Sequence, residues 1–186
     1  MKSQTVLLLT SLFIGFHTGS VLSQTGQIHD QHGEMNTRGD HVMGFSHEKT
    51  THHFRLYPDG GSIEVSANDP RDAATRDQIQ THLSHIAQMF TDGNFRAPML
   101  IHDQVPPGVP TLQRLEAAVL YRFEKTDRGG RVRITTTNPE ALRAVHEFLR
   151  FQISDHQTGD SPTVTSKPEQ ESVPPVETTG SQPHAN

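Results

Sequence analysis

The chain has 186 residues, with 16 Lys and Arg against 21 Asp and Glu, which gives a formal net charge of -5. This acidic balance argues against nucleic acid and anionic membranes as partners, because both need a clustered positive surface. The chain has no cysteine, so a site for a soft metal would have to use histidine and methionine. The hydrophobic content of 32% is enough for one small domain.

The first 23 residues have the pattern of a secretory signal peptide. Lys2 is followed by an apolar run from 6 to 16, which is too short to span a bilayer. Small or tolerated residues then precede the predicted cleavage after Ser23. We therefore expect a periplasmic or secreted protein without stable membrane insertion.

Residues 24–49 are rich in His, Gly and Asp and show little apolar periodicity, so we expect a flexible arm. His41, Met43 and His47 lie two to four residues apart in it, a spacing that a flexible loop can wrap around one ion. Imidazole together with thioether suits copper, especially Cu(I). A polar leader without a function is the alternative interpretation of the same residues.

Residues 50–156 carry the regular patterns of an α+β domain. The stretch "FRLYPDGGSIEVSANDP" (54–70) matches "FEKTDRGGRVRITTTNP" (123–139) without a gap. Each copy reads as a strand, a Gly-Gly turn, a second strand, and an Asp or Asn with Pro that starts a helix. The pattern predicts two ββα repeats, at about 50–93 and 116–156. They would form a four-stranded antiparallel sheet with two helices on one face, and the open sheet edges would allow a dimer.

Two segments outside the repeats have their own character. Residues 94–111 contain four prolines, which predicts an extended connection and no helix. Residues 157–186 are rich in Pro, Ser, Thr and Glu, which is typical of a disordered tail. The sheet face away from the helices is predicted to be solvated, since it would carry Arg55, Glu64, Arg122, Glu124, Arg131 and Arg133.

Histidine is the residue type that stands out, with 13 in the chain. The first hypothesis is a non-enzymatic periplasmic protein that buffers or delivers a transition metal, with copper as the expected cofactor. The proposed ligands come from the arm and from the domain: His41, Met43, His47, His52, His102 and His146. His52 also fits a structural role at the core edge, and His146 a satisfied position near the core. His82 and His85 are interpreted as solvated, and His156 as a helix cap.

Two alternatives remain open. The chain could be a periplasmic module that binds a protein or a small organic ligand, with an apolar pocket near Met99 and Val105. It could also be an enzyme that uses His102, Asp103 and His146. We favour a non-enzymatic role, because the sequence holds no recognisable nucleophile or phosphate-binding motif.

Three stretches of the sequence resemble a family of small exported bacterial proteins without an assigned activity. They are "MGFSHEKTTHHFRL", "IHDQVPPGVP" and "HEFLRFQISDHQTGD", and the resemblance covers roughly residues 43–160. It implies a bacterial protein of the cell envelope, and it implies no catalytic residue.

Overall fold

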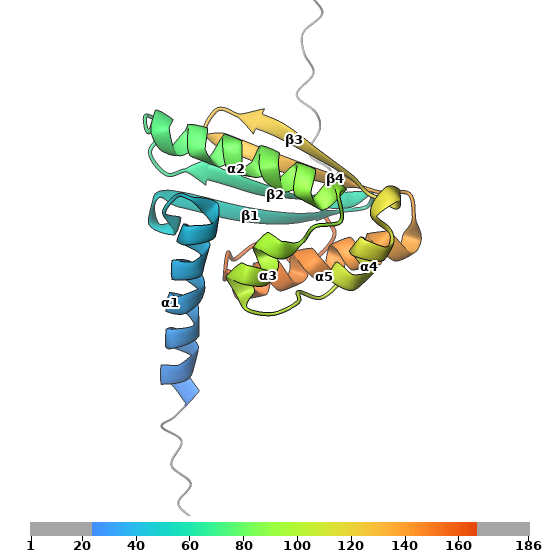
Figure 1. Cartoon of the computed structure of the whole chain (residues 1–186), viewed down its shortest axis with the longest axis horizontal. Coiled ribbons are helices and arrows are strands. Elements are labelled where there is room, and N and C mark those ends of the chain that lie inside the picture. Colours follow the sequence, from blue (N-terminus) through green and yellow to red (C-terminus); the bar gives the residue numbers. More distant parts are fainter. Residues whose placement is uncertain (1–23, 167–186) are drawn as a thin grey trace, which may run out of the picture.

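The computed structural model describes residues 24–166 (Figure 1). The predicted signal peptide and most of the predicted tail lie outside the described residues. The fold is α+β with a four-stranded antiparallel sheet, as the sequence predicted. The strands are β1 (Thr50–Tyr57), β2 (Gly60–Ala67), β3 (Leu120–Thr126) and β4 (Gly129–Thr135). Their order is β1-β2-β4-β3.

The two helices that follow the hairpins, α2 (Ala73–Thr91) and α5 (Pro139–Asp155), cover one face of this sheet. The helix α2 packs against β4 and β3, and α5 packs against β1 and β2. Each helix thus lies mainly over the hairpin that does not precede it in the chain. Phe90 of α2 and Phe148 of α5 meet edge to face, with ring centroids 6.0 Å apart. Both rings belong to one core that includes the inward-facing residues of all four strands.

The two helices begin in different ways. Asn138 caps α5 by accepting hydrogen bonds from the backbone N–H groups of the first turn, and Pro139 is the first helical residue, as the sequence predicted. For α2 the predicted start at Asp69 and Pro70 is wrong. Asp72 caps this helix and accepts a 3.0 Å hydrogen bond from the Thr75 N–H. The structural equivalence of the two ββα units stays a prediction.

Residues 24–43, predicted as part of a flexible arm, form the helix α1 (Gln24–Met43). Met35, Gly39 and Met43 are spaced four residues apart, and the first two are buried. This narrow stripe packs against α3, and the Arg38 side chain donates a 3.0 Å hydrogen bond to the Ile101 carbonyl. A short 3-10 turn, His47–Lys49, then leads into β1. The stripe was missed because one of its members is a glycine.

The proline-rich connector also differs from the prediction. It contains two short helices, α3 (Arg96–His102) and α4 (Val109–Arg114), followed by the 3-10 turn Glu116–Ala118. Pro98 and Pro110 lie in the first turns of α3 and α4, where a backbone N–H has no partner within the helix. Proline count alone therefore did not exclude helices here.

The start of the predicted disordered tail is ordered along the edge of β1. The Thr165 N–H donates a 2.9 Å hydrogen bond to the Leu56 carbonyl, beside a parallel bridge between Leu56 and Val164. The Asp160 carboxylate accepts a 2.9 Å hydrogen bond from the Phe54 N–H and lies 2.9 Å from Nδ1 of His53. These contacts join positions more than 100 residues apart, so the local composition could not indicate them.

The outer face of the sheet carries the predicted charged residues, with one exception to the expected solvation. Arg131 pairs with Glu64 at 3.2 Å and with Glu124 at 3.6 Å. Arg133 is buried, and its guanidinium donates to the carbonyls of Gly61 (2.7 Å) and Ile134 (2.5 Å). It also pairs with Asp59 and lies over the Tyr57 ring. Arg133 is therefore not solvated, unlike the prediction for this face.

Candidate functional site

A small, partly open cavity lies between the β1–β2 hairpin and the helices α2, α3 and α5. Its volume is about 60 Å³. Most of its wall is apolar, and the polar side chains are four histidines and one glutamine. The lining residues are Met43, His52, Phe54, Ile63, Val65, His82, Leu83, Ile86, Phe90, Ala97, Pro98, Ile101, His102, Phe148, Gln152 and His156.

Each long helix contributes a line of three residues to this cavity. On α2 the line is His82, Ile86 and Phe90. On α5 and its C-cap the line is Phe148, Gln152 and His156. The spacing of four residues places each set on one helix face. In both lines a phenylalanine lies at one end and a histidine at the other.

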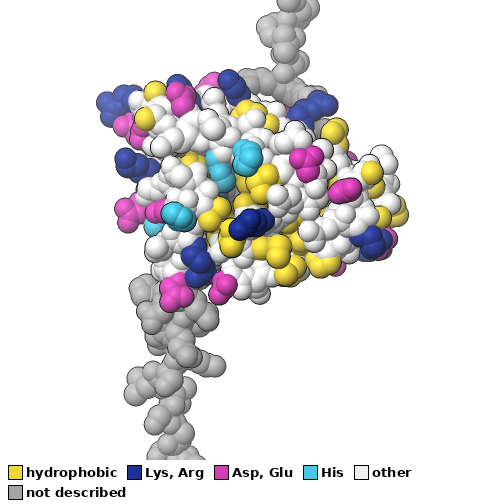
Figure 2. All heavy atoms as spheres, viewed as in Figure 1, with side chains coloured by type: hydrophobic (Ala, Val, Ile, Leu, Met, Phe, Trp, Pro, Cys, Tyr) yellow, Lys and Arg dark blue, Asp and Glu magenta, His cyan; other side chains and the backbone are white. Residues whose placement is uncertain are grey.

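The histidines form a group at one side of the cavity. The rings of His52 and His156 are stacked with centroids 5.7 Å apart, and Phe54 lies 5.5 Å from His156. His82 contacts Phe45 edge to face at 5.6 Å. Figure 2 shows histidine side chains between hydrophobic ones near the middle of this face of the molecule.

His102 is the most enclosed of the four, with 1% of its side chain exposed. Its Nδ1 lies 2.5 Å from a carboxylate oxygen of Asp155, and its Nε2 lies 3.0 Å from Oε1 of Gln152. The ring also contacts His156 edge to face at 5.0 Å. Both ring nitrogens are therefore used in hydrogen bonds.

Two of the cavity histidines are held in the uncharged form. Burial, with the nearby His82, His53 and His47, lowers the pKa of His52 to about 4, against a small opposing effect of Asp40. Burial, followed by the neighbouring His85, lowers the pKa of His82 to about 4. At neutral pH both imidazoles therefore carry no charge.

The structure brings together three of the six predicted metal ligands, namely Met43, His52 and His102. His47 is close to this group in sequence, but its Nδ1 lies 2.9 Å from Asp40. His41 is exposed on α1. His146 lies elsewhere on α5, where Nε2 donates to the carbonyls of Tyr57 (2.9 Å) and Gly60 (3.0 Å). Within residues 24–166, no group of three His, Asp or Glu side chains is arranged to hold a metal ion.

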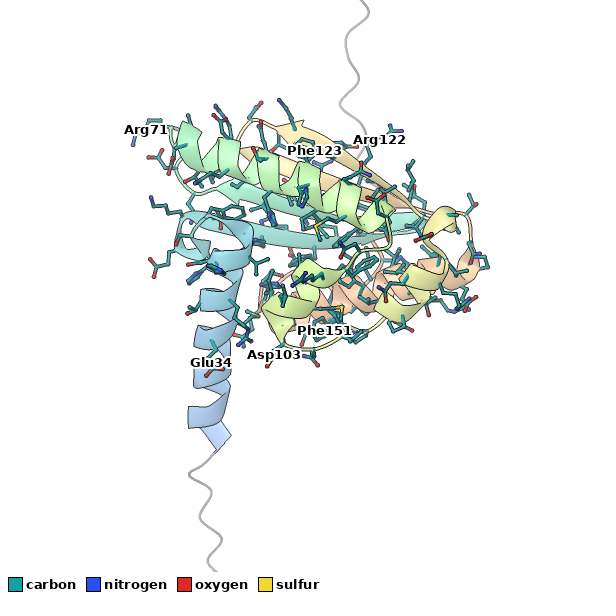
Figure 3. All side chains as sticks on the ribbon, in the orientation of Figure 1. Glu34, Arg71, Asp103, Arg122, Phe123 and Phe151 are labelled. Carbon is teal, nitrogen blue, oxygen red and sulfur yellow. The ribbon has the colours of Figure 1, made fainter. Side chains whose placement is uncertain are left out.

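The residues of the two alternative sites are also placed differently from the prediction. Val105 is 50% exposed, and the connector instead lines the cavity with Pro98 and Ile101. His102 pairs with Asp155, whereas Asp103 is exposed at the end of α3 (Figure 3). His102, Asp103 and His146 are therefore not joined by the hydrogen bonds that an acid/base site would need.

Three residues of the site were not predicted from the sequence: His82, Gln152 and His156. His82 was interpreted as solvated, but it is half-buried in the cavity wall. His156 caps α5, as predicted, and its ring also joins the histidine group. The available signal was their position on the same helix faces as Phe90 and Phe148.

An open groove lies next to the cavity on the outer side of α2. Its volume is about 470 Å³. It is lined by Met43, Gly44, Ala74, Asp77, Gln78, Thr81, His82 and His85. Met43 and His82 line both the groove and the cavity, so these two side chains form the wall between them.

Comparison with protein-family models, with curated proteins and with solved structures found no match. The resemblance to exported bacterial proteins therefore stays a prediction. No helix within residues 24–166 is both long and apolar enough to cross a membrane.

Proposed function

We propose that this protein binds a small, largely apolar organic molecule in the cavity between α2, α3, α5 and the β1–β2 hairpin. The observation that carries the proposal is the cavity itself, which combines an apolar wall with a group of histidines at one side. The cavity alone has room for about two water molecules, so an organic ligand also needs the space that opens when the wall toward the groove of about 470 Å³ moves. Apolar sites with a few polar groups that fix orientation are typical of small-molecule binding.

A molecule would enter the cavity from the groove, at the place where the Met43 and His82 side chains separate the two. Met43 is the last residue of α1, and it is followed by Gly44, which has a positive φ of 78°. A methionine side chain has several rotatable bonds and adapts easily to new neighbours. Rotation of this side chain would join the groove to the cavity.

The charge state of the site selects an uncharged ligand. His52 and His82 are neutral at neutral pH, because burial lowers the pKa of each to about 4. A buried ion would need a charged partner or several hydrogen bonds to offset its desolvation. A neutral molecule with a hydrocarbon body is therefore the best match.

Filling the cavity tests the proposal. Ala97 is buried in α3 and lines the cavity, so Ala97→Leu would occupy the space that a ligand needs. We expect methylenecyclopentane to shift the NMR signals of the Ile63 and Ile86 methyl groups in the wild type and not in this variant. Ala73→Leu, on the exposed start of α2, is the matched control and should behave as wild type. Equal binding by all three proteins, or binding by none, would contradict the proposal.

Copper binding is the second candidate, favoured by one observation. Met43, His52 and His82 line the same cavity and offer a thioether and two uncharged imidazoles, a ligand set that suits Cu(I). Titration with Cu(I) and Zn(II) tests it. We expect one tightly bound Cu(I) that is lost in both Met43→Leu and His52→Gln. Unchanged Cu(I) binding in these two variants would exclude this site.

The export signal leads to a related proposal on location. We infer that the protein acts in the periplasm or outside the cell, because its first 23 residues have the pattern of a cleaved signal. Fractionation of cells that express the full chain, with mass analysis of its N-terminus, tests this. A mature protein that starts at Gln24 in the periplasmic fraction is the expected result, and an uncleaved chain in the cytoplasm would contradict it.

A further inference from the structure

One buried polar atom at the cavity has no partner among the described residues. Gln152 is only 4% exposed, and it lines the cavity from α5. Its Oε1 lies 3.0 Å from Nε2 of His102, but its own Nε2 has no hydrogen-bond partner. Buried polar side-chain atoms are usually paired, so an unpaired one in a native protein calls for an explanation.

The surroundings of Gln152 are mostly apolar. The rest of the lining from β1, β2 and α2 is hydrocarbon, and the other polar side chains of the wall are the imidazoles of His52, His82, His102 and His156. Leaving a buried amide unpaired costs more than making its hydrogen bond gains. A molecule in the cavity can supply the missing partner.

The bond to His102 keeps the amide in place but leaves one of its two polar ends unused. The Asp155 carboxylate accepts a hydrogen bond from the Nδ1–H of His102. If Nε2 also carries a proton, it donates to Oε1 of Gln152 and leaves the NH₂ group unpaired. If Nε2 has no proton, the amide turns over and leaves its oxygen unpaired. In both states Gln152 presents a single polar atom beside an apolar wall.

We propose that the ligand carries one uncharged oxygen, a carbonyl or a hydroxyl, which forms a hydrogen bond with the Gln152 amide while its hydrocarbon body extends from the cavity into the adjoining groove. This inference rests on the proposed function and names the ligand class: small ketones and alcohols with a branched or cyclic body. Asp155 and His102 are positioning residues in this arrangement, since Asp155 holds His102 and His102 holds the Gln152 side chain.

Three probes of nearly equal size test the inference: cyclopentanone, cyclopentanol and methylenecyclopentane. The first two carry an oxygen where the third carries a carbon. In an NMR titration we expect at least one oxygenated probe to bind the wild type about tenfold more tightly than the hydrocarbon, which corresponds to one net hydrogen bond in a buried site. Its binding should also shift the side-chain NH₂ signals of Gln152.

Two variants and one control separate the possible explanations. Gln152→Met keeps the size of the side chain and should bind all three probes with equal affinity. Gln152→Glu keeps the contact with His102 and removes the NH₂ group, so it should lose a preference for the ketone. Gln88→Met changes an exposed glutamine of α2 and should retain the wild-type preference.

The outcomes distinguish this inference from the proposed function. Equal affinity of the wild type for all three probes would show that the cavity binds molecules but that Gln152 is satisfied by water, and would overturn the inference alone. A preference that persists in both Gln152 variants would overturn it as well. Binding of none of the probes would overturn the proposed function together with the inference.

Discussion

The unusual state of His52 leads to a direct prediction about stability and pH. Burial and three neighbouring histidines lower its pKa in the folded protein to about 4, whereas an unfolded chain gives histidine a pKa of about 6.5. Between these two values the unfolded state binds more protons than the folded state. The free energy of unfolding therefore falls as the pH drops below about 6.5, and this contribution levels off below about 4.

The size of the effect follows from the difference between the two pKa values. One such histidine lowers the free energy of unfolding by about 2 kcal/mol when the pH falls from 7 to 4.5. His82 has a similarly lowered pKa and adds a comparable loss. Because His82 is one of the causes of the His52 shift, the two losses need not be additive.

Urea unfolding of the metal-free protein at a series of pH values measures this effect. His52→Gln removes one titrating group, so its free energy of unfolding should fall less than that of the wild type between pH 7 and 4.5, by about 2 kcal/mol. His41→Gln changes an exposed histidine of α1 and should follow the wild-type curve. Parallel curves for the wild type and His52→Gln would refute the account of a buried, uncharged His52.

Three further predictions concern the framework around the site. Arg133→Met leaves buried carbonyl groups without their donor and should lower the free energy of unfolding by about 3 kcal/mol. Arg122→Met, on the exposed part of the same sheet face, should change it by less than about 0.5 kcal/mol. Chemical denaturation of both variants measures this difference. Gly108 has a φ of 83°, and an added Cβ would clash with a backbone carbonyl of α5, so Gly108→Ala should cost more than about 2 kcal/mol. Gly159 has a φ of 75°, but an added Cβ would meet no other atom, so Gly159→Ala should lower the free energy of unfolding by only about 1 kcal/mol. Equal losses of thermal stability in the two variants would contradict this difference. Asp160→Ala removes the acceptor that holds the chain against β1, so it should cost about 1–2 kcal/mol and speed amide exchange in residues 157–166; unchanged exchange there would disprove the role of this carboxylate.

The sheet was predictable because its signals are local. Alternating apolar residues in Phe54–Leu56 and Ile63–Val65, separated by two glycines, define a hairpin without reference to the rest of the chain. The apolar stripes of α2 and α5 are equally local. The start of α2 was misplaced because Asp69 and Asp72 are both good caps, and only the final packing selects the second.

The site was only partly predictable because it depends on contacts between distant segments. His52 and His102 were selected for their chemistry, and the structure places both at one cavity. His156 and Gln152 were not selected, since their role depends on where α5 lies relative to α3 and β1. His146 was also selected, but its side chain lies at the β1–β2 turn. Backbone carbonyls of that turn already accept its Nε2–H.

The arm illustrates a different limit. His41, Met43 and His47 were expected to move freely and to meet the domain around one ion. His41 and Met43 lie on the helix α1, His47 lies in the 3-10 turn that follows it, and only Met43 reaches the cavity. Regular backbone thus separates side chains that a flexible chain could have brought together.

The central claim is that a small apolar molecule occupies the cavity, and the most direct test is to locate such a molecule on the protein. Nuclear Overhauser contacts between methylenecyclopentane and the methyl groups of assigned residues report this location. The account predicts contacts with Ile63, Leu83 and Ile86, which line the cavity. Contacts confined to Leu100 and Leu120, which are exposed on the surface, would contradict it.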